Sequence, residues 1–69
     1  MKYIVIELQK TGDTVSHILT TFDTINEAES HYYSILAAAA ISSVSVHSAV
    51  IITEEGYPLK RECYKHITG

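Results

Sequence analysis

The sequence predicts an α+β domain with the element order β-β-α-β-β, in which one helix packs on one face of a four-stranded sheet. Apolar and polar residues alternate in both the first and the last part of the chain, as in half-buried strands. A Gly-Asp turn, KTGDT, separates the first two β-rich runs. Between the two pairs of strands, the apolar residues follow a helical period. With 69 residues, the chain is expected to form one domain, residues 1–69.

The first two predicted strands, residues 2–9 and 15–22, form a hairpin around the KTGDT turn. Successive side chains of a strand point to opposite faces of the sheet. The two faces of the first strand therefore carry alternate residues, namely Ile4, Ile6 and Leu8 against Tyr3, Val5 and Glu7.

The predicted helix begins in the segment FDTINEAES. Thr24 followed by Glu27 forms a capping box, and Asp23 is an alternative cap. The buried stripe of the helix is expected to contain the apolar residues with helical spacing, namely Ala28, Tyr32, Ile35, Leu36 and Ala39. The helix ends at ISS, which contains no Gly or Pro stop signal.

The last two predicted strands are residues 43–52 and 58–67, joined by a turn that contains Gly56. One face of the third strand carries Val44, Val46, Val50 and Ile52, and the other carries His47, Ala49 and Ile51. In the last strand, Leu59, Cys63 and Ile67 are expected to point inward, towards the helix.

A single helix leaves one face of the sheet uncovered, and that face is expected to be polar in a monomer. The set predicted for the uncovered face is instead mixed: Tyr3, Val5, His17, Leu19, His47, Ala49, Ile51 and Tyr64, with Glu7, Lys60, Glu62 and His66. Burial of such aliphatic and aromatic groups is worth several kcal/mol at about 25 cal/mol per Å². We therefore expect a homo-oligomer, most simply a two-fold dimer, with Tyr3, Val5, His17, Leu19, His47 and Ile51 in its interface.

The helix offers a second candidate interface, because Tyr33 and Ala37 flank its buried stripe. Small side chains allow another helix to approach closely. Alanine is also a strong helix former, so helix propensity alone equally explains Ala37.

Composition excludes several classes of function. The chain has 5 Lys and Arg against 8 Asp and Glu, which argues against binding to a DNA or RNA duplex. Residues 30–53 lack charged side chains, but their Ser and His residues argue against a membrane span. A single cysteine and an N-terminal segment that reads as a strand rather than a secretion signal predict a cytoplasmic protein.

The segment PLKRECYKH raises the question of metal binding or Cys–His catalysis. Residues Cys63 and His66 are three apart, so they point to opposite faces of a strand. A structural zinc site needs four ligands, and this chain has one Cys and four separated His residues. We therefore expect no metal, no cofactor and no enzymatic activity.

The same segment supplies cations and aromatic rings that suit a phosphate-containing ligand. The candidate ligand-binding residues are Lys60, Arg61, Tyr64, Lys65 and His66, with Tyr57 from the preceding turn. In an oligomer, two such strips could together form a pocket. The alternative is a solvated edge strand, in which Lys prevents unwanted pairing. His17, His47 and His66 likewise form either a ligand surface or ordinary interface contacts.

The whole chain resembles small uncharacterised proteins encoded by bacteriophages and prophages, through MKYIVIELQ, TFDTINEAES, SILAAAAISSVSVHSAV and ECYKH. This resemblance implies a viral accessory protein in the host cytoplasm that binds its target stoichiometrically. The expected function is inhibition of host antiviral defence, by sequestering a nucleotide-like signalling molecule at subunit interfaces or by capping a host protein. The alternative is a protein–protein interaction or virion assembly module without a small-molecule ligand.

Overall fold

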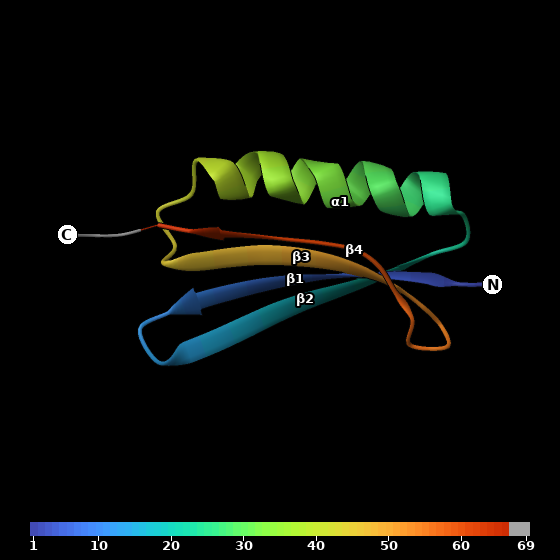
Figure 1. The fold of residues 1–69 in the computed structure, drawn as a ribbon, viewed down its shortest axis with the longest axis horizontal. Helices are drawn as coiled ribbons and strands as arrows, with labels where there is room; N and C mark the ends of the chain where they lie inside the picture. The colour runs from blue at the N-terminus through green and yellow to red at the C-terminus, as the bar shows by residue number, and fades with distance from the viewer. Residues whose placement is uncertain (67–69) are drawn as a thin grey trace.

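The computed structural model describes residues 1–66 and confirms the predicted element order (Figure 1). Its elements are β1 (Tyr3–Thr11), β2 (Thr14–Phe22), α1 (Ile25–Ala40), β3 (Val46–Thr53) and β4 (Pro58–Lys65). The four strands form one sheet, and α1 lies along one of its faces. The predicted α+β class is therefore correct.

The strand order is β2-β1-β3-β4, and all neighbouring strands are antiparallel. The register places Glu7 opposite Ile18 on one side and opposite Ala49 on the other. Ala49 in turn lies opposite Glu62. Because directly opposed residues share a face of the sheet, these four residues lie in one row on the same face.

Two glycines with positive φ make the tight connections between strands. Gly12 has a φ of 61° and is the first central residue of the two-residue β1–β2 loop, the position that glycine occupies in a type II′ hairpin turn. Gly56 has a φ of 89° in the β3–β4 connection. There, the backbone N–H of Thr53 donates to the carbonyl of Tyr57 at 2.9 Å.

The start of α1 agrees with the predicted cap. The Thr24 hydroxyl accepts a hydrogen bond from the backbone N–H of Glu27 at 3.2 Å and lies 2.9 Å from the carboxylate of Glu27. The predicted apolar stripe faces the sheet, with all its residues buried except Leu36, which is half-buried. The core consists of Val5, Ala28, Tyr32, Ile35, Ala49 and Ile51.

The alternation within the strands was predicted correctly, but the two faces were exchanged in β1, β3 and β4. In β2, His17 and Leu19 lie on the uncovered face, as expected. Val5, His47, Ala49 and Ile51 were expected on the uncovered face, and all four are buried beneath α1. Both alternate sets of the central strands contain β-branched residues, so hydropathy alone did not distinguish them. A change of phase by one residue moves every side chain to the opposite face.

The same inversion applies to β4. Leu59 and Cys63 were expected to point inward, but both are exposed, Leu59 to 47%. Ile67, assigned to the same face, lies outside the described residues. Lys60, Glu62 and Tyr64 take the helix side instead, because their partners in β3 are Ile51, Ala49 and His47.

Candidate functional site

The face of the sheet away from α1 is an uncovered surface that carries apolar side chains from β1, β2 and β3. We call it the open face. It follows from the register, and its apolar residues are Ile4, Ile6, Leu8, Val15, Leu19, Val46, Val50 and Ile52. Leu19 and Val15 are 56% and 60% exposed. In a soluble antiparallel sheet, the face that lacks a covering layer is normally polar, so this composition indicates a contact surface.

The charged side chains of the open face all have the same sign. They are Lys10, Arg61 and Lys65, and the register places no Asp or Glu on this face of the described strands. The whole chain nevertheless has a formal net charge of −3. The acidic side chains are therefore segregated away from this apolar surface.

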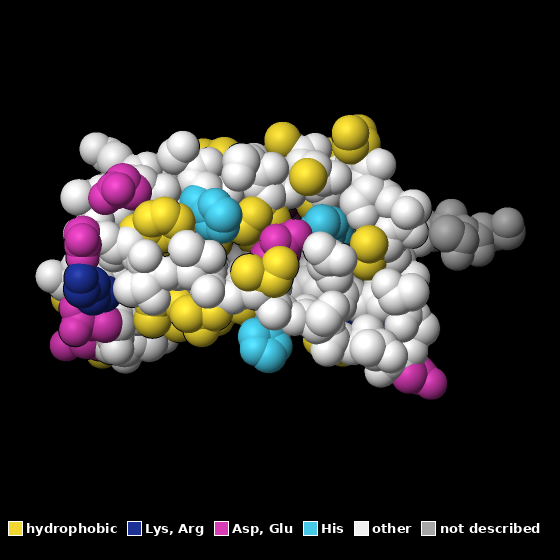
Figure 2. Space-filling model, turned by 180° about the vertical axis from the view of Figure 1, so that it is seen from behind, with side chains coloured by type: hydrophobic (Ala, Val, Ile, Leu, Met, Phe, Trp, Pro, Cys, Tyr) yellow, Lys and Arg dark blue, Asp and Glu magenta, His cyan; other side chains and the backbone are white. Residues whose placement is uncertain are grey.

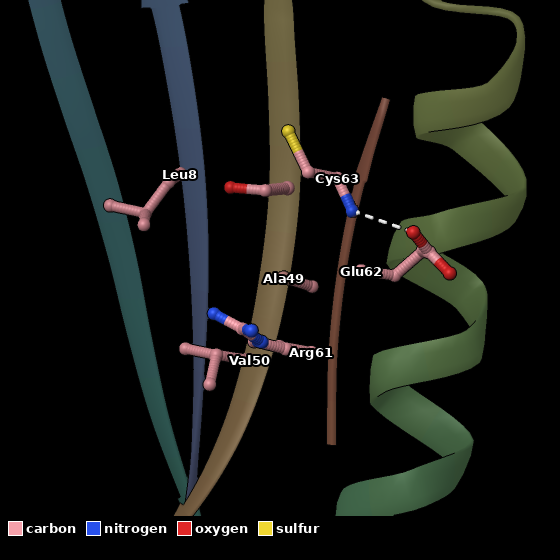
Figure 3. A pocket seen from close by; sticks show the side chains of 7 residues that line it. Leu8, Ala49, Val50, Arg61, Glu62 and Cys63 are labelled. Carbon is pink, nitrogen blue, oxygen red and sulfur yellow. Dashed lines mark hydrogen bonds between the residues drawn. The ribbon is translucent and has the colours of Figure 1, made fainter. Parts of the chain in front are cut away.

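A shallow cavity of about 380 Å³ lies on the open face between β1, β3 and β4. Figure 3 shows Leu8, Val50, Arg61 and Cys63 on the side of the sheet away from α1, whereas Glu62 points towards the helix. The Glu62 carboxylate accepts a hydrogen bond from the backbone N–H of Cys63 at 3.0 Å. The cavity thus combines aliphatic walls, a thiol and one guanidinium.

The residues predicted to form a ligand strip are divided between the two faces. Arg61 and Lys65 lie on the open face, and Lys60 and Tyr64 lie on the helix side. The Lys60 ammonium donates to the Tyr33 hydroxyl at 2.7 Å and to the Glu29 carboxylate at 2.9 Å. These contacts, first that with Tyr33 and then that with Glu29, raise the pKa of Lys60 above its ordinary value.

His66 and Tyr57 are also separated from the cations of the open face. The His66 ring donates from Nε2 to the backbone carbonyl of Ala39 at 2.7 Å, at the end of α1, where the same carbonyl also accepts from the backbone N–H of Ser42 at 3.3 Å. Tyr64 stacks on the His66 ring with centroids 6.5 Å apart. Tyr57 is 67% exposed in the β3–β4 turn. The structure therefore does not assemble the six predicted ligand residues into one site.

The structure also places Cys63 and His66 on opposite faces, as predicted. Cys63 is exposed on the open face, and His66 contacts α1. Within residues 1–66, no three His, Cys, Asp or Glu side chains lie together as a metal-binding group.

The predicted interface residues also differ in their accessibility. His17, Leu19, Tyr33 and Ala37 are exposed, and their place in an interface stays a prediction. Three others are wrong as surface contacts, because α1 covers them: Val5, His47 and Ile51. Tyr3 is half-buried and packs against the core.

A buried Glu–His pair is the main feature that sequence reasoning missed. His47 is 4% exposed, and its Nε2 donates to the Glu7 carboxylate over 2.6 Å. Gln9 donates to the same carboxylate oxygen at 3.0 Å. Burial raises the pKa of Glu7, but the hydrogen bonds from His47 and Gln9 outweigh that effect, so the pKa lies below its ordinary value.

The sequence did contain a signal for this pair. Glu7 alternates in phase with Val5, and His47 alternates in phase with Ala49 and Ile51. A polar residue in phase with core positions of two strands indicates a buried partner. Nδ1 of His47 is buried and has no hydrogen-bond partner within residues 1–66.

Comparison with known proteins gives no matching family model, no significant match to a curated protein and no significant match to a solved structure. None of the helices in the described part of the chain is long and apolar enough to cross a membrane.

Proposed function

We propose that this chain is a non-enzymatic protein–protein interaction module whose open face binds an apolar protein surface with acidic side chains around it. The single observation that carries this proposal is the composition of the open face, which is largely aliphatic and whose charged side chains, within the described strands, are all cations. Desolvated aliphatic groups supply affinity, and opposite charges around them supply orientation and specificity.

The size of the open face suits a small interface. Four strands spaced at about 4.8 Å and eight to nine residues long at about 3.3 Å per residue give a projected area of roughly 500 Å². A specific interface buries in total at least about 1,000 Å², or about 500 Å² on each partner. The face reaches this threshold when nearly all of it is covered.

The chemistry of the exposed side chains supports a binding role without a catalytic cycle. His17 shares the open face with Cys63, but it lies on β2, with β1 and β3 between it and β4. His47 is buried with Glu7, and His66, which follows β4, contacts α1. With the resemblance to phage accessory proteins, the partner we propose is a bacterial host protein in the cytoplasm, such as a component of antiviral defence.

Affinity capture from a bacterial host lysate with quantitative mass spectrometry tests this proposal. Arg61→Gln combined with Lys65→Gln removes two exposed cations from the open face and should abolish retention of a stoichiometric partner. The matched control is Lys60→Gln, which removes a cation of the same strand from the helix side and should retain it. A set of captured proteins that is the same for all three baits would contradict the proposal.

A second candidate is an anionic, partly apolar small molecule of the nucleotide class, favoured by the cavity beside Arg61. A volume of about 380 Å³ lies within the usual range of ligand pockets, roughly 300–1,000 Å³. Calorimetry with cyclic and linear nucleotides would measure this binding. Heat that is the same for the wild type and Arg61→Gln would exclude the cavity as the site.

A further inference from the structure

β2 forms one edge of the sheet and lacks every feature that normally protects an edge strand. Its nine residues, TVSHILTTF, include no charged residue, no Pro and no Gly. Val15, Ile18 and Leu19 are 60%, 58% and 56% exposed. Long, uncharged, apolar edge strands readily pair with another strand.

The opposite edge, β4, is protected in several ways. It begins with Pro58, carries Lys60, Arg61 and Lys65, and has a register irregularity opposite Ile51 and Ile52. Proline, lysine and bulges are the usual means of preventing pairing at an edge. Only one of the two edges in the described sheet is thus available for strand addition.

The rest of the domain leaves the β2 edge uncovered. α1 packs mainly over β1 and β3, which explains why Ile18 is exposed although it lies on the helix side. In Figure 1, β2 lies along the lower side of the molecule, with no element beyond it. On that side in Figure 2, the coloured side chains are hydrophobic or His, and the Asp, Glu, Lys and Arg side chains lie at the ends.

The hairpin determines which backbone groups of β2 face outward. The two residues that flank a two-residue loop, here Thr11 and Thr14, form a hydrogen-bonded pair, and such pairs recur at every second residue. The even-numbered residues of β2 therefore bond to β1. The outward-facing N–H and C=O groups belong to the odd-numbered residues Val15, His17, Leu19 and Thr21.

We propose that β2 pairs antiparallel with β2 of a second copy of this chain, about a two-fold axis at Ile18, and forms one continuous eight-stranded sheet. In this register, Val15 lies opposite Thr21 of the second copy, and His17 lies opposite Leu19. All four outward-facing residues then join hydrogen-bonded pairs, and Ile18 lies opposite its own copy.

The second copy is the partner that this strand fits best. The register that centres on Ile18 pairs all nine residues of β2, and it brings no like charges together because the strand has none. The inference is independent of the proposed function, since it uses the edge of the sheet rather than the open face. A dimer of this kind would join two open faces side by side and double the apolar surface.

Sedimentation equilibrium or light scattering measures the dimer directly. Ile18→Lys places two ammonium groups opposite each other at the two-fold axis, and should weaken dimerisation about 100-fold or more. The matched control is Leu59→Lys, an exposed leucine of β4 that is 47% accessible, and this variant should remain dimeric. A wild type that is monomeric at all concentrations would overturn the inference, as would an Ile18→Lys variant that dimerises normally.

Cross-linking tests the register separately. In a background with Cys63→Ser, Ile18→Cys should form a disulfide-linked dimer on mild oxidation, because opposed residues that are not hydrogen-bonded have Cα atoms about 4.5 Å apart. Val15→Cys is the control, since its partner in this register is Thr21. Equal cross-linking of the two variants would refute the two-fold axis at Ile18. The open-face variant with Arg61→Gln and Lys65→Gln should dimerise normally, so the two proposals can fail independently.

Discussion

The Glu7–His47 pair can be tested by a double-mutant cycle. Glu7→Leu leaves the buried imidazole of His47 without its carboxylate partner, and Nδ1 already has no hydrogen-bond partner within residues 1–66. Leaving a buried polar group unsatisfied costs about 1–3 kcal/mol. We expect Glu7→Leu to destabilise the fold by about 2 kcal/mol, the middle of that range. His47→Leu should cost a similar amount, because the largely buried carboxylate then keeps only its bond from Gln9.

The double variant should be much less destabilised than the sum of the single variants. Replacing both partners by apolar groups of similar shape is often nearly neutral, so we expect a cost below about 1 kcal/mol. The coupling energy is then about 2 + 2 − 1, or about 3 kcal/mol, the upper end for directly contacting residues.

The expected effects are large for a domain of this size. At about 0.05–0.15 kcal/mol per residue, a chain of 69 residues has a free energy of unfolding of roughly 3–10 kcal/mol. A loss of about 2 kcal/mol should lower the Tm by about 8–16 °C. Urea unfolding followed by far-UV circular dichroism, at one fixed protein concentration, measures all four members of the cycle.

Glu62→Leu is the matched control for the cycle. Glu62 and Glu7 both lie opposite Ala49 on the helix side of the sheet, but Glu62 is exposed, and its carboxylate accepts a hydrogen bond from the backbone N–H of Cys63. This control should change stability by no more than about 0.5 kcal/mol. Costs of the single variants that add up to the cost of the double variant would refute the reasoning, as would a Glu62→Leu variant as unstable as Glu7→Leu.

Two further predictions concern acid stability and the helix cap. Burial raises the pKa of Glu7, but the bonds from His47 and Gln9 lower it by more, so the group stabilises the fold above its unfolded pKa of about 4.3. This contribution should be lost as the pH falls below that value. In urea titrations between pH 6 and pH 3, the free energy of unfolding should therefore fall less for Glu7→Gln than for the wild type. Thr24→Ala removes the acceptor for the N–H of Glu27 and should cost about 1 kcal/mol, whereas Thr24→Ser should retain most of the stability measured by the urea midpoint.

The local signals in the sequence predicted the elements well because each acts over a few residues. The Thr24–Glu27 cap and the Gly12 turn both depend on backbone geometry within four residues, and both are present in the structure. The helical stripe was correct for the same reason, because side chains three and four apart on a helix share a face regardless of the rest of the chain.

The faces of the sheet depend on information that is not local. In β1, Ile4 and Ile6 lie on one face and Val5 on the other, and both sets are apolar enough to pack against a helix. The two possible choices of covered face differ in whether their polar side chains can pair with one another. Glu7 and His47 are in phase with the covered face, and burying them together lets the Glu7 carboxylate accept from Nε2 of His47. The cations of the other phase share their face with no Asp or Glu of the described strands. Pairing polar residues across predicted strands before choosing a face would have favoured the observed phase.

The same exchange of faces alters the functional reading of PLKRECYKH. Lys60, Tyr64 and His66 contact α1 or one another, so they stabilise the position of the helix. Arg61 and Lys65 remain on the open face. The cations of β4 are therefore divided between the two faces of the sheet, and only Arg61 and Lys65 are available to a partner at the open face. A largely aliphatic surface whose charged side chains, within the described strands, are all cations would accumulate like charge on packing against itself. We therefore assign this face to a different protein and the uncharged β2 edge to a second copy.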